Sequence, residues 1–226
     1  MTRTQKVGSP PTTELILREA ARLFSSKGFH GTSTREIADA VGIRQPSLFH
    51  HFPSKHAIAE ALFQYDYDRS PGLQLRPELP DATPPVRLFQ ITRREVLVEL
   101  TSAYDLRGLY LSALMDDPEF AHWRATYEQS LSAAGDLIRE GIKTGDFVDK
   151  DPTMAVEILD ALVNQAVRWA PRHRDLSLPD EAAEMALRLV IKRPSRIPAI
   201  RREADRLLVA AGTPWPEEIA LATQTR

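Results

Sequence analysis

A run of helix starts and glycine stops near the beginning of the chain constrains its fold more than any other feature. Apolar residues recur at helical spacing over Thr12–Lys27, and Gly28 ends the run as a left-handed cap would. Ser33 and Glu36, three residues apart, form the capping box that typically opens a helix, and Gly42 provides the next stop. This segment is therefore predicted to form short helices joined by tight turns.

Two of these helices, Ser33–Val41 and Gln45–Phe52, are separated by a turn that contains Gly42 and Ile43. Leu48 is expected to point toward the core together with Ile43. This spacing is that of a helix-turn-helix, whose second helix enters the major groove of DNA. The side chains left on the outward faces of that helix are Gln45, Ser47, Phe49, His50 and His51.

The rest of the chain is also predicted to be helical, because no segment shows the sustained alternation of apolar and polar residues that a strand requires. Ser54 is expected to cap a fourth helix, and Ser70–Pro85, which holds five prolines, is typical of a lid or a flexible connection. Further helices are expected at about Val86–Tyr104, Leu106–Met115, Pro118–Thr144, Pro152–Ala170, Asp180–Lys192 and Pro198–Ala211. The predicted fold class is all-α.

Charge is distributed unevenly along the chain. The first 60 residues hold eight basic and five acidic side chains, a charge of +3, so the remainder carries −5 of the total of −2. A basic head on an acidic body suggests that one end of the protein meets a polyanion.

Composition and motifs exclude several classes of protein. The chain has no cysteine, no apolar run of the ~20 residues that a membrane helix needs and no signal-peptide pattern, so a soluble cytoplasmic protein is expected. Its glycines form neither GxGxxG nor GxxxxGK, and there is no HExxH. Asp116 and Asp117 are adjacent carboxylates, but Asp117 is better explained as a helix cap. We expect no catalytic residue, no cofactor and no metal site.

Together, the motifs of the first quarter of the chain resemble the DNA-binding head of the tetracycline-repressor (TetR) family. The residues that carry the resemblance are Ile16, Ala20, Ala21, Leu23, Phe24, Gly28, Thr32, Ser33, Glu36, Ile37, Ala38, Val41, Gly42, Ile43, the run Gln45–Phe52, Ser54 and Lys55. The resemblance implies a homodimeric, ligand-responsive regulator, usually a repressor, that releases palindromic operator DNA when a small molecule binds. It implies a helix-turn-helix domain at residues 1–55 and a helical ligand-sensing and dimerisation domain at 56–226.

The resemblance also implies which residues contact DNA. Ser33 and Thr34 would hold a phosphate where the amides of their helix point outward. Arg35 would reach a guanine edge, and Gln45 an adenine or a neighbouring base. The other residues of the predicted set are Arg44, Pro46, Ser47, Phe49, His50, His51 and Lys55.

Within this set, Pro46 and Ser47 would meet base methyls or phosphate, whereas His51 and Lys55 would grip the backbone. At Phe49 the family more often has tyrosine. The missing hydroxyl removes a hydrogen bond to phosphate but keeps the apolar contact with a thymine methyl.

The resemblance places dimerisation and ligand binding in the larger domain. The broad apolar stripe of Pro152–Ala170 would pair with Asp180–Lys192 and their two-fold mates in a four-helix interface, although plain burial within one chain would explain the stripe as well. Aromatic side chains in a helical bundle are usually core, but several lie on helices that would surround a ligand. The ligand-contact candidates are Phe89, Tyr104, Tyr110, Trp123, Tyr127 and Asn164.

Two rival functions stay open. One is a helical protein-interaction module whose basic head binds no specific DNA sequence, and the other is an enzyme. The arm Met1–Pro11, with Arg3 and Lys6, could lie in a minor groove or be a frayed end. The tail Thr213–Arg226 could pack through Trp215 or stay loose.

Overall fold

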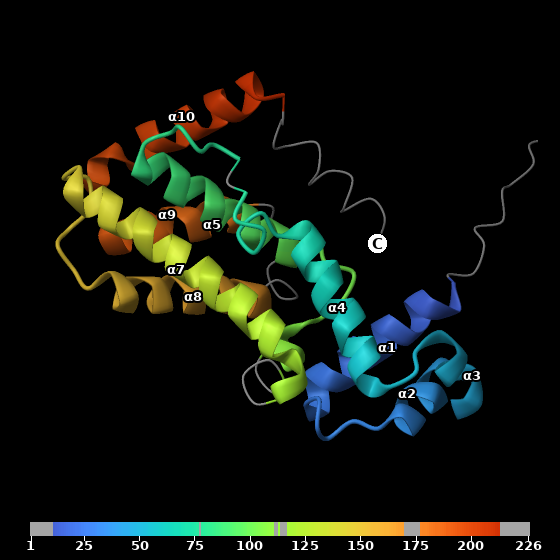
Figure 1. Cartoon of the computed structure of the whole chain (residues 1–226). Coiled ribbons are helices and arrows are strands. Elements are labelled where there is room, and N and C mark those ends of the chain that lie inside the picture. The colour runs from blue at the N-terminus through green and yellow to red at the C-terminus, as the bar shows by residue number, and fades with distance from the viewer. Residues whose placement is uncertain (1–10, 77, 111–112, 114–116, 170–176, 213–226) are drawn as a thin grey trace, which may run out of the picture. The chain divides into compact units, whose positions relative to one another are not determined.

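The computed structural model describes residues 11–76, 78–110, 113, 117–169 and 177–212, with the side chains of 107 and 166–169 excepted. The predicted all-α fold is confirmed. Within these residues the structure contains helices and a single antiparallel bridge between Phe147 and Ile191 (Figure 1). The basic arm with Arg3 and Lys6, Asp116 and the tail with Trp215 lie outside the described residues.

Most helices begin and end close to the predicted positions, but the segment predicted as a helix at Leu106–Met115 is α-helical only at Arg107–Leu109 in the described residues, and 111–112 and 114–116 lie outside them. The helices are α1 (Thr12–Lys27), α2 (Thr34–Val41), α3 (Gln45–His51), α4 (Lys55–Arg69), α5 (Pro84–Leu100), α6 (Arg107–Leu109), η2 (Pro118–Phe120), α7 (Ala121–Lys143), α8 (Pro152–Trp169), α9 (Leu178–Val190), η3 (Pro194–Arg196) and α10 (Ile197–Ala210).

The chain forms two compact units, and the first comprises residues 1–66 and 103–124. Its core is aromatic: Phe29 and Phe120 meet edge to face at 5.4 Å, and Phe63 meets Phe120 at 5.2 Å. Gly108 of α6 lies so close to α1 that a Cβ there would sit 2.0 Å from the carbonyl oxygen of Phe24. The helix-turn-helix is thus built on a well-packed base.

The second unit comprises residues 67–102 and 125–226, and α5 packs mainly on α9 and α10. Its apolar core contains the fully buried Phe89 and Phe147. Arg93 of α5 is buried between Asp180 of α9, at 2.8 Å, and Asp205 of α10, at 2.6 Å. The ion pair with Asp180 and the charge-assisted hydrogen bond to Asp205 help to fix the register of these three helices.

Two predicted segments differ from the structure for local reasons. Helix α5 ends at Leu100 rather than Tyr104. The amide and the hydroxyl of Thr101 both donate to the carbonyl of Leu97, at 2.9 and 2.8 Å, and the next amide, that of Ser102, bonds three residues back to Glu99 instead of four, which closes the helix with a tighter turn. The long loop after α4 is not a loose connection. Ser70 Oγ and the amide of Gly72 both donate to the carboxylate of Glu95, at 2.8 and 3.0 Å, which fastens the loop to α5.

Candidate DNA-binding surface

The helix-turn-helix has the caps and the turn that the sequence predicts. Ser33 Oγ accepts a bond from the amide of Glu36 at 3.2 Å, and the Glu36 carboxylate accepts one from the amide of Ser33 at 2.9 Å. Gly42 has a φ of 78°, which lets the chain turn sharply between α2 and α3. Both features are confirmed.

Helix α3 has one buried face and one open face. Leu48 is fully buried and Phe52 is 8% exposed, whereas Phe49, between them in sequence, is 44% exposed. The other exposed residues of α3 and its cap are Arg44, Pro46, Ser47, His50 and His51. An apolar ring held in water among polar groups and a guanidinium is typical of a surface that meets a partner.

Gln45, at the start of α3, is positioned by the helix before it. Its Nε2 donates to the hydroxyl of Thr34 at 2.9 Å, and the residue is half-buried. Its amide plane is therefore fixed relative to α2, and its Oε1 and second N–H proton stay available for a base edge. A pre-oriented amide loses less entropy on binding than a free one.

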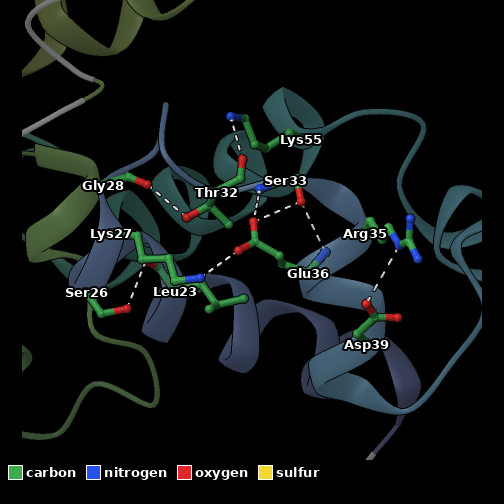
Figure 2. A network of polar contacts seen from close by, with 10 residues as sticks. All are labelled: Leu23, Ser26, Lys27, Gly28, Thr32, Ser33, Arg35, Glu36, Asp39 and Lys55. Carbon is green, nitrogen blue, oxygen red and sulfur yellow. Dashed lines mark hydrogen bonds and ion pairs between the residues drawn. The ribbon is translucent and has the colours of Figure 1, made fainter.

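The N-terminus of α2 is already occupied by a carboxylate. The hydroxyl of Ser33 also donates to Glu36, at 2.9 Å, and the Lys27 ammonium lies 2.6 Å from the other oxygen of that carboxylate (Figure 2). The bond from Lys27, followed by the bonds from Ser33, lowers the pKa of Glu36 to about 2. A phosphate at this position would have to displace Glu36 or bind to the amide of Thr34. The phosphate role of Ser33 therefore stays a prediction, and the Glu36 carboxylate competes with the phosphate for the same groups.

Lys55, at the start of α4, is engaged in the protein. Its ammonium donates to the carbonyl oxygens of Phe29 at 2.7 Å and Thr32 at 2.8 Å, and the Thr32 bond is drawn in Figure 2. Partial burial lowers the pKa of Lys55 below its usual value. The third N–H bond of the ammonium stays available for a phosphate.

Two further residues of the predicted DNA-contact set are Arg35 on α2 and His51 on α3. The Arg35 side chain is 81% exposed, and its guanidinium lies 4.0 Å from the carboxylate of Asp39. An ion pair this long and this exposed is weak, so it would not prevent Arg35 from binding a guanine. Nδ1 of His51 lies 3.2 Å from the hydroxyl of Thr13 on α1. The structure thus brings all predicted DNA-contact residues onto the two helices, their caps and the start of α4.

The predicted ligand residues are divided between the two units. Three belong to the first unit, where Tyr110 donates to Asp66, Trp123 donates to Glu60 at 2.7 Å and Tyr104 packs on Tyr65. The other three, Phe89, Tyr127 and Asn164, belong to the second unit. Their ligand role stays a prediction.

Tyr127 and Asn164 share one polar neighbour. The amide of Asn164 donates to the Asp160 carboxylate at 3.1 Å, and Tyr127 also bonds to that carboxylate. Burial, followed by the charge of Asp160, raises the pKa of Tyr127. This cluster ties α7 to α8.

Sequence reasoning misses the partners that hold the surface in place. The helical pattern gives no reason to pair Lys27 with Glu36, or Thr34 with Gln45. It does not single out His56 either, yet Nε2 of His56 lies 2.9 Å from Asp117 Oδ2, while Asp117 Oδ1 caps Glu119 as predicted. Pairs this far apart in the sequence leave no periodic signal.

Comparison with known proteins agrees with this geometry. Residues 16–62 match the model of the family described as bacterial regulatory proteins, tetR family. None of the helices within the described residues has the length and apolarity that a bilayer crossing demands.

Three relatives span most of the chain. The transcriptional repressor KstR2 of Mycolicibacterium smegmatis is 28% identical over 159 residues, which cover 68% of this chain and 77% of the relative. The crystal structure of AmtR from Mycobacterium smegmatis has a TM-score of 0.64 and 28% identity, and the match covers 88% of this chain and 95% of AmtR. The structure of AibR in complex with isovaleryl coenzyme A and operator DNA has a TM-score of 0.64 and 22% identity, covering 79% of this chain and 97% of AibR. Residues 16–62 of this chain thus match the DNA-binding part of the TetR family of transcriptional regulators, and the likeness to a transcriptional repressor extends over about two thirds of the chain.

Proposed function

We propose that this protein is a ligand-responsive repressor that binds palindromic operator DNA as a homodimer. The observation that carries the proposal is the open face of α3, which exposes an aromatic ring and two imidazoles on the same short helix as the pre-oriented amide of Gln45. A helix presented in this way fits the major groove. Such a repressor would work in the bacterial cytoplasm, where the operator lies.

The homodimer is supported by apolar side chains that stay in water in the single chain. Met154 and Ile158 of α8, four residues apart, are each nearly half exposed, and so are Met185 and Leu189 of α9. Helices α8 and α9 pack on each other, so two apolar stripes lie on neighbouring helices. A palindromic operator needs two recognition helices related by a two-fold axis, which such an interface would provide.

Binding of a small molecule as well as operator DNA is supported by the relatives. AibR was crystallised in complex with both isovaleryl coenzyme A and operator DNA, and KstR2 is a transcriptional repressor. Members of this family are normally regulators rather than enzymes. By the same likeness we assign this protein repression rather than activation.

Selection of bound fragments from genomic DNA tests the proposal. Fragments recovered with the full-length protein should share an inverted repeat, and unlabelled competitor carrying that repeat should displace them far better than bulk DNA. Arg44→Glu on the α3 cap should abolish the shift, whereas Arg202→Glu, an equal charge change at an exposed site on α10, should not. Fragments without a common sequence, displaced equally by any duplex, would favour the protein-interaction module instead.

A further inference from the structure

A cavity of about 300 Å³ lies in the second unit, between the loop that follows α4, helix α5 and helix α7. Its volume is at the lower end of the range of about 300–1,000 Å³ found for small-molecule sites. The apolar part of the wall is formed by Pro71, Leu75, Ile91, Ala133, Ala134 and Leu137. None of the six predicted ligand residues lines it.

The charged groups of this wall are already matched by the protein. Arg94 lies 3.6 Å from Glu78, Arg87 lies 2.8 Å from Glu140, and Asp136 lies 2.6 Å from Arg139. The third acid of the wall, Glu95, accepts the bonds that fasten the loop. A charged ligand would lose its hydration and find its counter-charges occupied, so the wall favours a neutral one.

Two polar atoms on neighbouring positions of α5 are buried without a hydrogen-bond partner in the described structure. They are Oε1 of Gln90, a residue 2% exposed, and Nε of Arg87. The Gln90 amide nitrogen does have a partner, because it donates to Glu78. Both residues line the cavity, and residues three apart on a helix are neighbours. A small adjustment of their side chains toward the cavity would therefore offer a ligand an unmet acceptor and an unmet donor together.

The loop side of the cavity is strained. Leu75 has a φ of 53° and is the one non-glycine residue with a positive φ in the described chain. Strain of this kind is concentrated at ligand clamps and switch regions. The strained residue therefore lies in the wall of the cavity itself.

We infer that this cavity binds a neutral, mainly apolar molecule through a hydroxyl group, which donates to Gln90 Oε1 and accepts from Arg87 Nε. One hydroxyl supplies both missing partners without adding charge. The site is the effector site of the repressor, a role that rests on the function proposed above.

Three naphthalene derivatives of similar shape test the chemistry on the full-length protein by titration calorimetry. The probes are 2-naphthylmethanol, its methyl ether, which has lost only the donor, and 2-naphthoate, which is charged. The alcohol should bind roughly three- to tenfold more tightly than the ether, the worth of one hydrogen bond, and more tightly than the carboxylate. Equal binding of alcohol and ether, a preference for the carboxylate, or no binding of any probe overturns the inference.

Variants then locate the site. Gln90→Met should reduce the affinity for the alcohol to that for the ether, and Ala134→Leu should weaken both by at least about tenfold by filling the cavity. Ser132→Leu, the same kind of change at an exposed residue of α7 outside the wall, should bind as the wild type does. Unchanged binding by both Gln90→Met and Ala134→Leu places the probe elsewhere and refutes the site.

The same preparations separate this inference from the proposed function. Probe binding is measured without DNA, and operator binding is measured by gel shift. Operator binding without any probe binding refutes the cavity assignment alone, whereas the expected probe series without sequence-specific DNA binding refutes the repressor alone.

Discussion

The ammonium of Lys55 donates to the backbone carbonyl of Phe29 at 2.7 Å and lies 4.3 Å above the centre of the same residue's ring. One side chain at the start of α4 thus holds both the backbone and the aromatic group of the segment that leads into α2. Lys55, which we propose as a phosphate contact, therefore also stabilises the fold, and its effects on DNA binding and on stability can be measured separately.

Lys55→Met keeps the aliphatic stem but leaves the carbonyls of Phe29 and Thr32 without their donor. Leaving buried acceptors unpaired should lower the free energy of unfolding by about 1–3 kcal/mol. If Lys55 also neutralises a phosphate, the slope of log affinity against log salt should become shallower by about one for that phosphate. Urea unfolding and binding at several salt concentrations measure the two effects. A loss of stability with an unchanged salt slope would remove Lys55 from the DNA-contact set.

Gln45→Ala should relax the preference at one base position of each half-site and cost about 1–3 kcal/mol there. Thr34→Val removes the acceptor that orients Gln45, so it should weaken the same base preference by a smaller amount. Binding to a library of single-base operator variants measures both. Equal losses on every sequence would show that Gln45 does not read a base.

The capping box predicts a pH dependence at the acid end. The pKa of Glu36 is about 2 in the folded protein against a usual 4.5, so the unfolded chain takes up the proton first. The stabilisation is complete above pH 4.5 and is lost as the pH falls toward 2. Unfolding at about pH 5 and about pH 3 should therefore show a difference between the wild type and Glu36→Gln that shrinks with acidity. A difference that stays constant would contradict the assignment.

Gly141 and Gly135 make a matched pair on α7. A Cβ on Gly141 would lie 2.0 Å from the ring of Phe147, which is fully buried, so Gly141→Ala should destabilise the protein by about 1–3 kcal/mol or more. A Cβ on Gly135 would meet only the guanidinium of Arg139 at 3.4 Å, so Gly135→Ala should stabilise the helix by up to about 1 kcal/mol. Thermal unfolding compares the two, and changes of the same sign would refute the packing argument.

The dimer proposal predicts opposite outcomes at two exposed apolar residues. Ile158→Glu on α8 should dissociate the homodimer and weaken operator binding, because it buries a charge in the proposed interface. Val209→Glu on α10 should stay dimeric, although Val209 is the more exposed of the two, at 68% against 46%. Sedimentation equilibrium decides between monomer and dimer. A dimeric Ile158→Glu variant would move the interface elsewhere.

The helix-turn-helix could be predicted from sequence because its determinants are local. The capping box of Ser33 and Glu36 spans three residues, and the turn at Gly42 depends on one backbone conformation that glycine adopts without strain. The burial of Leu48 beside the exposed Phe49 follows from helical periodicity alone.

The ligand cavity could not be predicted in the same way. Size favours aromatic residues as ligand-contact candidates, yet Phe89 is fully buried in the core and Trp123 packs beside Phe63. Within the described residues, the wall of the cavity contains no aromatic side chain, and on α7 it includes the short side chains of Ala133 and Ala134, which leave space beside them. The sequence shows which side chains are large, whereas a cavity is a space that the packed side chains leave unfilled.

The sequence by itself determined the helices, their caps and the family, because hydrogen bonds within one turn and apolar periodicity act between neighbours in the chain. Only the tertiary structure decided that Lys55 bonds to Phe29, that Lys27 pairs with Glu36, and that the loop after α4 is fastened through Glu95. These bonds join residues that are not neighbours in the sequence, and each charged group bonds to one of several partners that the sequence offers. That selection depends on distance and burial, which exist only once the helices have packed.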